Sequence, residues 1–485
     1  MVQKTWFQVI LVTLAGLALY LPFLASQYDT NGVVEALAVE SGQLFHKNHL
    51  LYRVIGYAVY RGLQFGGYSG RAIVVLQTMN AICGAVGIGL AYLTYKRTAQ
   101  TTAAFAGTLL FACSFSNWLF STDVAYITMA GMFASASAAL TLNSRSPVAA
   151  AAAGLLTALS ILTWQASIFL IPALVLLSIQ MKHAKYAAIY TAAAVIVAGL
   201  TYIIVAAARH DITSVASFAG WFTTYGEGGT LPMWGRWEAQ RFHIALGSAL
   251  KSILPIPLAV PLSQISLNVQ LGRIAVDLAL VGFGLLGMLA AMKTSARSLR
   301  FLGAYLLFLP FIVWWDPFDP KWFFVPNLFF AGFFACALTP WFRNRYASLF
   351  ILGTLFFMAA TNFVTTIGPR HRDVGPDRRM AQCVAENMRP NDLLLAAEWG
   401  WPDYLEYLHG RRSLSLISHP SSVQEGLDEV SRASGRAYIP NPAAHSDDHL
   451  AWLQSQSGVT REDLNRLVDA PAFSCYGRTI FFVRN

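Results

Sequence analysis

The sequence has few charged side chains. Only 12% of its 485 residues are Asp, Glu, Lys or Arg, whereas 55% are hydrophobic, and a soluble domain carries about 25% charged residues. The shortage is uneven, because long apolar segments alternate with short polar ones up to about residue 365. This pattern excludes a single soluble domain. It predicts a polytopic membrane domain over residues 1–365 and a soluble domain over residues 366–485.

Other signals are missing as well. The net charge of +9 comes without a basic stripe interleaved with aromatic residues, so we expect no nucleic acid as a partner. The five cysteines form no CxxC pair and no Cys/His cluster, which gives no indication of structural zinc. The apolar segments are nearly free of ionisable residues, which disfavours a proton-coupled carrier.

The apolar segments suit membrane-spanning helices, since about 20 helical residues cross a bilayer about 30 Å thick. We interpret the first segment as a retained span, because its apolar run is too long for a signal peptide. Lys4 places the N-terminus in the cytoplasm, and each short loop on that side carries Lys or Arg, whereas external loops are acidic. Residues 148–181 contain two short apolar stretches broken near Trp164-Gln165 and form a re-entrant or paired-span segment. With that segment counted as two, we predict about eleven spans: 6–25, 71–95, 103–120, 124–142, 148–181, 187–208, 274–292, 299–315, 322–340 and 346–364.

The first external loop is expected to contain two helices that lie on the membrane surface. Residues 30–42 carry apolar side chains on one side and end at Gly42, which is typical of a short amphipathic helix. Residues 50–64 contain two arginines and are too short to span comfortably. The alternative, in which 50–64 crosses the membrane, would invert every later basic loop.

Ionisable residues gather in the external loops, and their types suit a glycosyl transfer from a lipid-phosphate sugar. A carboxylate there would act as general base toward an acceptor hydroxyl. The phosphate leaving group would benefit from positive charge, supplied by a basic side chain or by Mg²⁺ or Mn²⁺ held on carboxylates. The candidates are Asp29 as base, Asp123 as metal ligand with Asp29, and His49, Arg53, Asp316, Asp319 and Lys321 as substrate-binding residues.

Each candidate also has a structural interpretation. Asp29 would cap the helix that begins near Thr30, and the other aspartates would shape tight turns between spans. Lys321 would anchor a span end at the membrane boundary, and His49 would simply lie at the interface. The long external segment 209–272 adds weaker candidates and an aromatic belt: Glu227, Arg236, His243, Trp221, Trp234 and Trp237.

The order of these features resembles the GT-C superfamily of membrane glycosyltransferases, which includes protein O-mannosyltransferases, aminoarabinose transferases and oligosaccharyltransferases. Their catalytic Asp in the first external loop corresponds to Asp29. The second interfacial helix of these proteins opens with a His-Pro-Pro-Leu-Tyr-like segment, matched here by His49-Leu50-Leu51-Tyr52 without the prolines. A Gly-x-Ser-x-x-x-Arg-like lead into the next span is matched by Gly66-Gly67-Tyr68-Ser69-Gly70-Arg71. Asp123 lies where the oligosaccharyltransferase branch has a metal-binding Asp.

The resemblance implies an inverting glycosyltransferase of the cytoplasmic membrane that uses a polyprenyl-phosphate sugar and a glycan, lipid or protein acceptor. The sequence departs from the pattern twice. The acidic pair of the first loop is reduced to Asp29 followed by Thr30, and a Lys of the fifth-and-sixth span region is replaced by Trp164-Gln165. Two other functions stay open: a transporter or flippase of lipid-linked substrates, and a non-catalytic assembly protein.

The tail, residues 366–485, alternates helical and strand patterns and predicts a small extracytoplasmic α/β domain. Its only two cysteines, Cys383 and Cys475, would form a disulfide in an oxidising compartment, with two unpaired buried thiols as the alternative. The predicted strands are 392–396, 413–417, 437–439 and 479–483, and the predicted helices are 402–409, 422–433 and 461–468.

Overall fold

The computed structural model forms two compact units. The first contains Met1–Ala25, Asn48–Asp211 and Trp234–His371, and the second contains Ser26–Lys47, Ile212–Met233 and Arg372–Asn485. The structure describes residues 2–143, 146–180, 184–209, 212–225, 231–232, 235–254, 295–417, 423–447, 450, 453–454 and 457–484.

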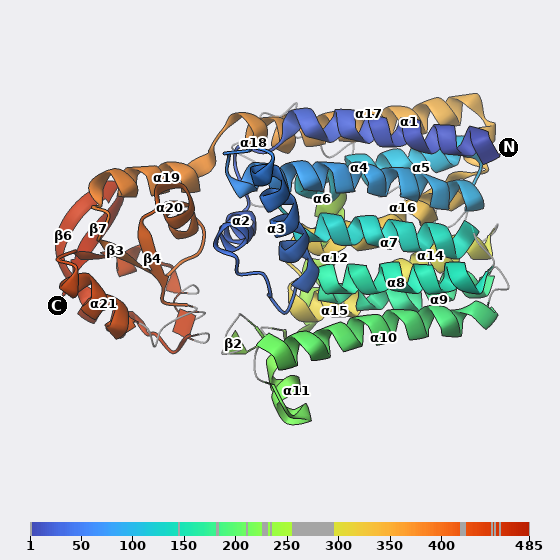
Figure 1. Ribbon diagram of the computed structural model, residues 1–485. Coiled ribbons are helices and arrows are strands. Elements are labelled where there is room, and N and C mark those ends of the chain that lie inside the picture. Colours follow the sequence, from blue (N-terminus) through green and yellow to red (C-terminus); the bar gives the residue numbers. More distant parts are fainter. Residues whose placement is uncertain are drawn as a thin grey trace. The chain divides into compact units, whose positions relative to one another are not determined.

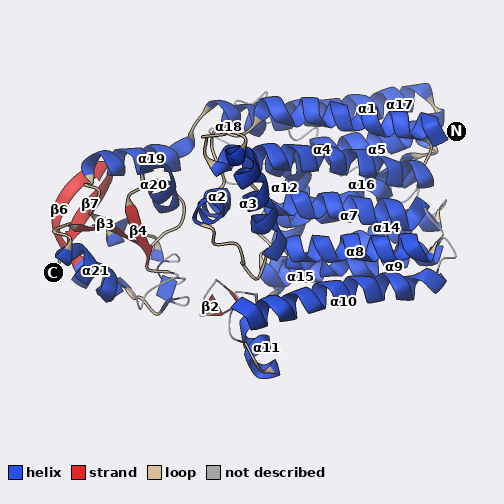
Figure 2. Cartoon of the chain, in the orientation of Figure 1, coloured by secondary structure: helices blue, strands red, loops and turns tan. Residues whose placement is uncertain are grey.

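The first unit is a bundle of helices (Figures 1 and 2). Several long apolar helices run along the bundle, and α3, α12, α15 and α18 lie at one end of it (Figure 1). The helices are α1 (Val2–Tyr20), α3 (Leu50–Phe65), α4 (Ala72–Thr98), α5 (Thr101–Cys113), α6 (Phe115–Ser121), α7 (Tyr126–Asn143), α8 (Pro147–Thr163), α9 (Leu170–Gln180), α10 (Ala184–Arg209), α12 (Ala239–Ile253), α14 (Ala296–Leu306), α15 (Leu309–Trp315), α16 (Phe324–Leu338), α17 (Arg345–Asn362) and α18 (Gly368–Arg372).

Six helical segments of the described residues are long and apolar enough to cross a membrane, and α5 with α6, bent by 60°, would form a seventh. Apolar helices occupy ten of the eleven expected spans, although α7, α8 and α9 are not among those six segments. The eleventh, at 274–292, lies outside the described residues. The fold is therefore that of a multi-pass membrane protein, and the count of eleven stays a prediction.

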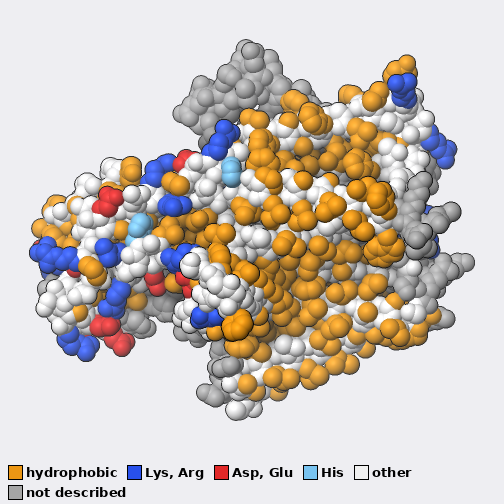
Figure 3. Space-filling model, turned by 45° about the horizontal axis from the view of Figure 1, so that its top comes forward, with side chains coloured by type: hydrophobic (Ala, Val, Ile, Leu, Met, Phe, Trp, Pro, Cys, Tyr) orange, Lys and Arg blue, Asp and Glu red, His pale blue; other side chains and the backbone are white. Residues whose placement is uncertain are grey.

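The outer surface of the bundle is apolar, as lipid contact requires. Figure 3 shows hydrophobic side chains spread over the long helices, with charged side chains concentrated elsewhere. Large side chains that would pack inward in a soluble protein are exposed on α1, α10 and α17; examples are Trp6, Phe7, Ile10, Ile203, Ile204 and Phe356.

Two breaks interrupt the apolar helices, and polar side chains satisfy the freed backbone groups. At the bend between α5 and α6, Ser114 Oγ donates to the Phe111 carbonyl at 3.0 Å and Asn362 Nδ2 donates to the Cys113 carbonyl at 2.7 Å. The second break separates α8 from a 3₁₀ turn at Gln165–Phe169. Unpaired backbone groups are costly in a bilayer, so irregular backbone is tolerated only where the protein buries and pairs it.

The second unit contains a five-stranded sheet with strand order β4-β3-β5-β7-β6. Strands β4, β3 and β5 are parallel, whereas β7 pairs antiparallel with both β5 and β6. A separate pair, β1 (Thr224–Tyr225) and β2 (Leu231–Pro232), is antiparallel. The sheet strands are β3 (Leu393–Ala396), β4 (Arg412–Ser415), β5 (Ala437–Pro440), β6 (Val468–Cys475) and β7 (Arg478–Val483), and the helices are α2 (Thr30–Ser41), α11 (Val215–Thr223), α19 (Gly375–Asn387), α20 (Trp401–His409), α21 (Val423–Arg432) and α23 (Arg461–Leu467).

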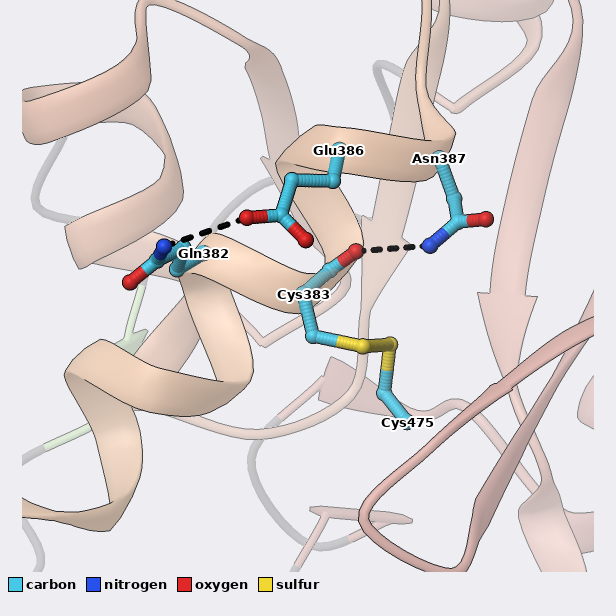
Figure 4. The surroundings of a disulfide bond; sticks show 5 residues. All are labelled: Gln382, Cys383, Glu386, Asn387 and Cys475. Atoms are coloured by element: carbon cyan, nitrogen blue, oxygen red, sulfur yellow. Dashed lines mark hydrogen bonds between the residues drawn. A yellow bond between two sulfur atoms is a disulfide. The ribbon is translucent and has the colours of Figure 1, made fainter.

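Four of these strands, β3, β4, β5 and β7, lie where the alternating pattern predicts them, and β6 was missed. The structure joins Cys383 of α19 to Cys475, the last residue of β6, through a disulfide with Cα atoms 5.9 Å apart (Figure 4). The bond fixes α19 to the edge strand of the sheet.

The first amphipathic helix expected in the external loop is α2, and it belongs to the second unit. It ends at Gly42, whose φ of 78° is the left-handed conformation that glycine adopts readily. Tyr407 of α20 donates its hydroxyl to Glu40 Oε1 at 2.9 Å, and Tyr404 bonds to the Tyr28 carbonyl. This part of the first loop therefore packs on α20.

Candidate active site

A buried ion pair joins Asp123 to Arg370 within the first unit. The Asp123 side chain is fully buried, and its Oδ2 lies 2.7 Å from Nη2 of Arg370, whose side chain is 21% exposed. Asp123 Oδ1 accepts the Val124 amide at 2.7 Å. The aspartate expected in a tight turn between spans is thus held by an arginine at the end of the last span.

Polar side chains of α4 fix the turn that carries Asp123. Asn80 Nδ2 donates to the main-chain carbonyls of Asp123 and Ala125 at 2.8 and 3.0 Å, and its Oδ1 accepts the Tyr52 hydroxyl at 3.4 Å. Asn80 is fully buried. Both the nitrogen and the oxygen of this buried side-chain amide are hydrogen-bonded. Moving the side chain would leave them unpaired, which is costly, so Asn80 holds the turn in place.

The end of the first span is tied to the same region. The Ala25 amide donates to the Thr122 carbonyl at 2.9 Å, and the Ala25 carbonyl accepts Gln77 Nε2 at 2.8 Å. His371 Nδ1 lies 2.8 Å from the Leu24 carbonyl. The ends of α1, α4, α6 and α18 therefore meet beside Asp123.

The second helix expected in that loop is α3, which begins after His49. The His49 ring is buried and stacks on Tyr126 with centroids 4.0 Å apart. Because Tyr126 begins α7, three residues beyond Asp123, the stack places His49 near the Asp123 turn. Arg53, one turn into α3, is also buried.

The acidic loop between α15 and α16 folds on its own side chains. Asp319 Oδ1 accepts the Lys321 amide at 2.9 Å, and its Oδ2 lies 2.7 Å from Lys321 Nζ. Asp316 accepts the Phe318 amide and Trp322 Nε1, each at 3.2 Å. Burial and then the nearby Asp319 charge raise the pKa of Asp316, although Lys321 and the hydrogen bonds oppose this.

Aromatic stacking joins this loop to the broken span. Trp322 stacks on Trp164, the residue at the break, with centroids 5.9 Å apart. The Gln165 amide lies 3.4 Å from the Asn48 carbonyl, next to His49. The structure thus connects Asp316, Asp319 and Lys321 through the broken span to the start of α3. In the sequence the break showed only as Trp164-Gln165 inside an apolar run.

Asp29 lies in the second unit and has the geometry of a helix cap. Its Oδ1 accepts the Asn31 amide at 2.9 Å, and its extended backbone, with φ −74° and ψ 142°, precedes α2. The cap interpretation of Asp29 is therefore present in the structure. A carboxylate can cap with one oxygen and still accept a proton, so this geometry is compatible with a second role.

The weaker candidates of the 209–272 segment that the structure describes take no part in the contacts of Asp123 and Arg370 described above. Trp237 is 63% exposed and His243 is exposed. Arg236 pairs with Glu238 at 3.2 Å on the surface. Trp221 is buried. Glu227 and Trp234 lie outside the described residues.

Several residues of the site were missed from the sequence. Arg241 of α12 directs Nη1 at the carbonyls of Val313 and Trp314 at the end of α15. The second unit has a polar contact of its own that the sequence did not indicate: Lys47 donates to the Trp221 carbonyl at 2.9 Å, and burial lowers the pKa of Lys47 to about 8. A signal existed for others, since polar residues inside an apolar span are uncommon: Gln77, Asn80 and Asn327.

A metal ion at Asp123 would need several ligands that converge on one point. Both Asp123 oxygens already have partners, and one of them is a cation. Within the described parts of the chain no three His, Cys, Asp or Glu side chains are grouped to hold a metal ion. These residues do not fit a cation at Asp123, and the expected Mg²⁺ or Mn²⁺ shared with Asp29 stays a prediction.

The fold is that of solved structures of ArnT and of an archaeal oligosaccharyltransferase. No protein-family model and no curated protein matches the sequence. Solved structures do match, at identities of 11–12%, which show a shared fold and leave the activity open.

The particular structures include ArnT from Cupriavidus metallidurans in the apo state, with a TM-score of 0.63, 11% identity and coverage of 99% of this chain and 98% of that chain. The same protein bound to undecaprenyl phosphate gives a TM-score of 0.62, 11% identity and 98% coverage of each chain. The Archaeoglobus fulgidus oligosaccharyltransferase in complex with Zn and sulfate gives 0.56 at 12% identity, covering 98% of this chain and 72% of that one. The GT-C resemblance seen in the first loop is confirmed for the fold.

Proposed function

We propose that this protein is a glycosyltransferase that moves a sugar from a polyprenyl-phosphate donor to an acceptor on the external face of the cytoplasmic membrane. The observation that carries the proposal is the GT-C fold over 99% of the chain. A polar cluster at one end of the apolar bundle supports it, because a lipid-linked donor needs apolar walls for its tail and polar groups for its phosphate and sugar.

The substrate class follows from what such a fold accommodates. One ArnT structure is bound to undecaprenyl phosphate, and one of the archaeal oligosaccharyltransferase AglB is in complex with an inhibitory peptide and a dolichol-phosphate. For this chain we infer a donor of the same chemical class, a sugar on a polyprenyl phosphate. The acceptor is a hydroxyl of a glycan, lipid or protein at the membrane surface.

The reaction would be a single displacement with inversion at the anomeric carbon. The acceptor oxygen forms a bond to that carbon while the bond to the phosphate oxygen breaks, and the electron pair leaves with the polyprenyl phosphate. Asp29 takes the acceptor proton as general base. Lys321 and Arg53 stabilise the departing phosphate, and His49, Asp316 and Asp319 contact the substrate.

The location is proposed from the charge pattern and the tail. Lys4 and the basic short loops favour a cytoplasmic N-terminus, and the Cys383–Cys475 disulfide supports an oxidising compartment for the second unit. The active side would then be external, in the compartment where lipid-linked sugars are presented after translocation.

Asp29→Asn tests the base directly. Asparagine caps a helix about as well as aspartate, so the variant keeps the Asn31 hydrogen bond and loses only the proton acceptor. We expect transfer to fall at least about 100-fold, the usual contribution of a general base, with unchanged expression. Asp29→Ala is the matched control for the cap. Normal transfer by a well-expressed Asp29→Asn variant would sink the assignment.

A transporter or flippase is separated from an enzyme by its product. Mass spectrometry of surface glycans and lipid-linked sugars in a strain lacking the protein would show the donor accumulating and one glycan losing a sugar if the protein is a transferase. A flippase predicts accumulation of donor on the cytoplasmic side and loss of every glycan that uses it.

A further inference from the structure

The charge balance at Asp123 is complete without any added ion. Asp123 is fully buried, and the guanidinium of Arg370 lies 2.7 Å from its Oδ2. An unpaired buried charge is strongly disfavoured, so the guanidinium of Arg370 supplies the opposite charge that compensates the Asp123 carboxylate. The exposed fraction of the arginine, 21%, means that the positive member of the pair is the one that reaches the surface.

Arg370 is fixed by the helix that carries it. A π-helical turn at Phe363–Ile367 joins α17 to α18, and such turns are frequent at functional sites. The next residue, His371, contacts the Leu24 carbonyl and lies edge-on to the Phe23 ring. These contacts hold the backbone at Arg370 in place, and the ion pair with Asp123 directs its side chain toward the carboxylate that a metal ion at this turn would need.

We propose that Arg370 takes the place of a divalent cation at Asp123, so that transfer by this protein requires no metal ion. The part of this inference that concerns transfer rests on the proposed function, whereas the part that concerns metal binding at Asp123 does not. An arginine suits the role because it stays protonated and presents a planar set of donors that matches carboxylate and phosphate oxygens. Arg370 acts as a positioning residue that holds Asp123 and its turn.

Metal binding provides a test that needs no transferase assay. Purified full-length protein and its Asp123→Asn variant are titrated with Mn²⁺, and bound ion is followed by electron paramagnetic resonance. We expect no binding that depends on Asp123, so the two titrations coincide. One Mn²⁺ bound tightly by the wild-type protein and lost in Asp123→Asn overturns the proposal, whatever the protein's activity.

Transfer provides the second test. We expect wild-type transfer to be unchanged by a chelator. Arg370→Gln should lose about 100-fold in kcat, because a turn that is no longer held in place misaligns the site. Arg370→Lys, which keeps the charge, is expected to retain more activity than Arg370→Gln and to be equally insensitive to the chelator. Loss of wild-type transfer with the chelator and its recovery with Mn²⁺ would refute the proposal.

Folding is controlled with the double variant Asp123→Asn/Arg370→Gln, which removes both charges. It is expected to elute as the wild-type protein does and, like it, to bind no Mn²⁺ at this turn. If the wild-type protein shows no transfer with any donor, the proposed function is contradicted. The Mn²⁺ titration then still tests whether Arg370 takes the place of a cation at Asp123.

Discussion

Nη2 of Arg370 lies 2.7 Å from Oδ2 of Asp123, although 247 positions separate the two residues in the chain. The pair joins the turn between α6 and α7 to α18. Breaking it from one side leaves a buried charge, whereas removing both charges does not.

Arg370→Gln should therefore destabilise the protein more than Asp123→Asn/Arg370→Gln does. We expect a loss of about 3–5 kcal/mol for the single variant, the range for an uncompensated buried charge, and a smaller loss for the double variant. The measurement is the unfolding midpoint of the detergent-solubilised protein. Equal midpoints for the two variants would show that the pair does not stabilise the fold.

Removing the disulfide should loosen the second unit. Cys383 and Cys475 are 92 residues apart, and closing a loop of that length typically stabilises a domain by about 2–4 kcal/mol. Cys383→Ser/Cys475→Ser should exchange the amides of β3 faster in hydrogen exchange of the full-length protein. Reductant should act on the wild-type protein in the same way and have no effect on the variant. Unchanged exchange of β3 in both cases would contradict the prediction.

The second unit should lose stability as the pH rises from about 4 to 6. Burial raises the pKa of Asp403 from 3.8 to about 6, against the opposing hydrogen bond from the Gly400 amide. In this window the folded state keeps the proton that the unfolded state has lost, so the free energy of unfolding falls with rising pH.

Asp403→Asn should flatten this dependence, because its side-chain oxygen still accepts the Gly400 amide and no longer titrates. Hydrogen exchange of β3, corrected for the intrinsic rate at each pH, measures it. Glu425→Gln, on the exposed side of α21, is the matched control and should keep the wild-type slope. The same slope in Asp403→Asn would assign the dependence to another group.

Cysteine labelling in intact cells tests the topology. Ser431→Cys in α21 and Thr102→Cys in α5 each place a thiol at an exposed position, while the free native cysteines Cys83, Cys113 and Cys336 are buried. In intact cells, a membrane-impermeant maleimide should label the Ser431→Cys variant and leave the Thr102→Cys variant unlabelled. After lysis it should label both variants. The reverse pattern would place α3 across the membrane and invert the predicted orientation.

The sequence predicts much of the fold because its signals are local. Long apolar runs locate the helices of ten expected spans, and alternating patterns locate four of the five strands of the tail. Strand β6 was not predicted because it contains Asp469 and Pro471, which are unfavourable in strands. Its pairing with β7 is irregular around Pro471. The sequence predicted both ends of α2, with Asp29 at its start and Gly42 at its end, because capping depends on the adjacent residues alone.

The contacts of the candidate site could not be predicted from the sequence, because most of them join segments that are far apart in the chain. Arg370 appeared only as the first member of a basic run after the last span, and nothing local indicates that it reaches Asp123. Asp316, Asp319 and Lys321 were recognisable as an acidic turn, but their link to Trp164 depends on how α8 and α16 pack. The catalytic role of Asp29 stays a prediction.

The central claim is tested most directly by purified protein in lipid vesicles that contain a polyprenyl-phosphate sugar donor and a lipid extract of the host envelope as acceptor. Mass spectrometry follows free polyprenyl phosphate and the glycosylated acceptor together. The account predicts that the wild-type protein forms both in equal amounts and that Asp29→Asn, folded to the same degree, forms neither at a comparable rate. Equal product formation by the two proteins, or an intact donor with the wild-type protein, would contradict it.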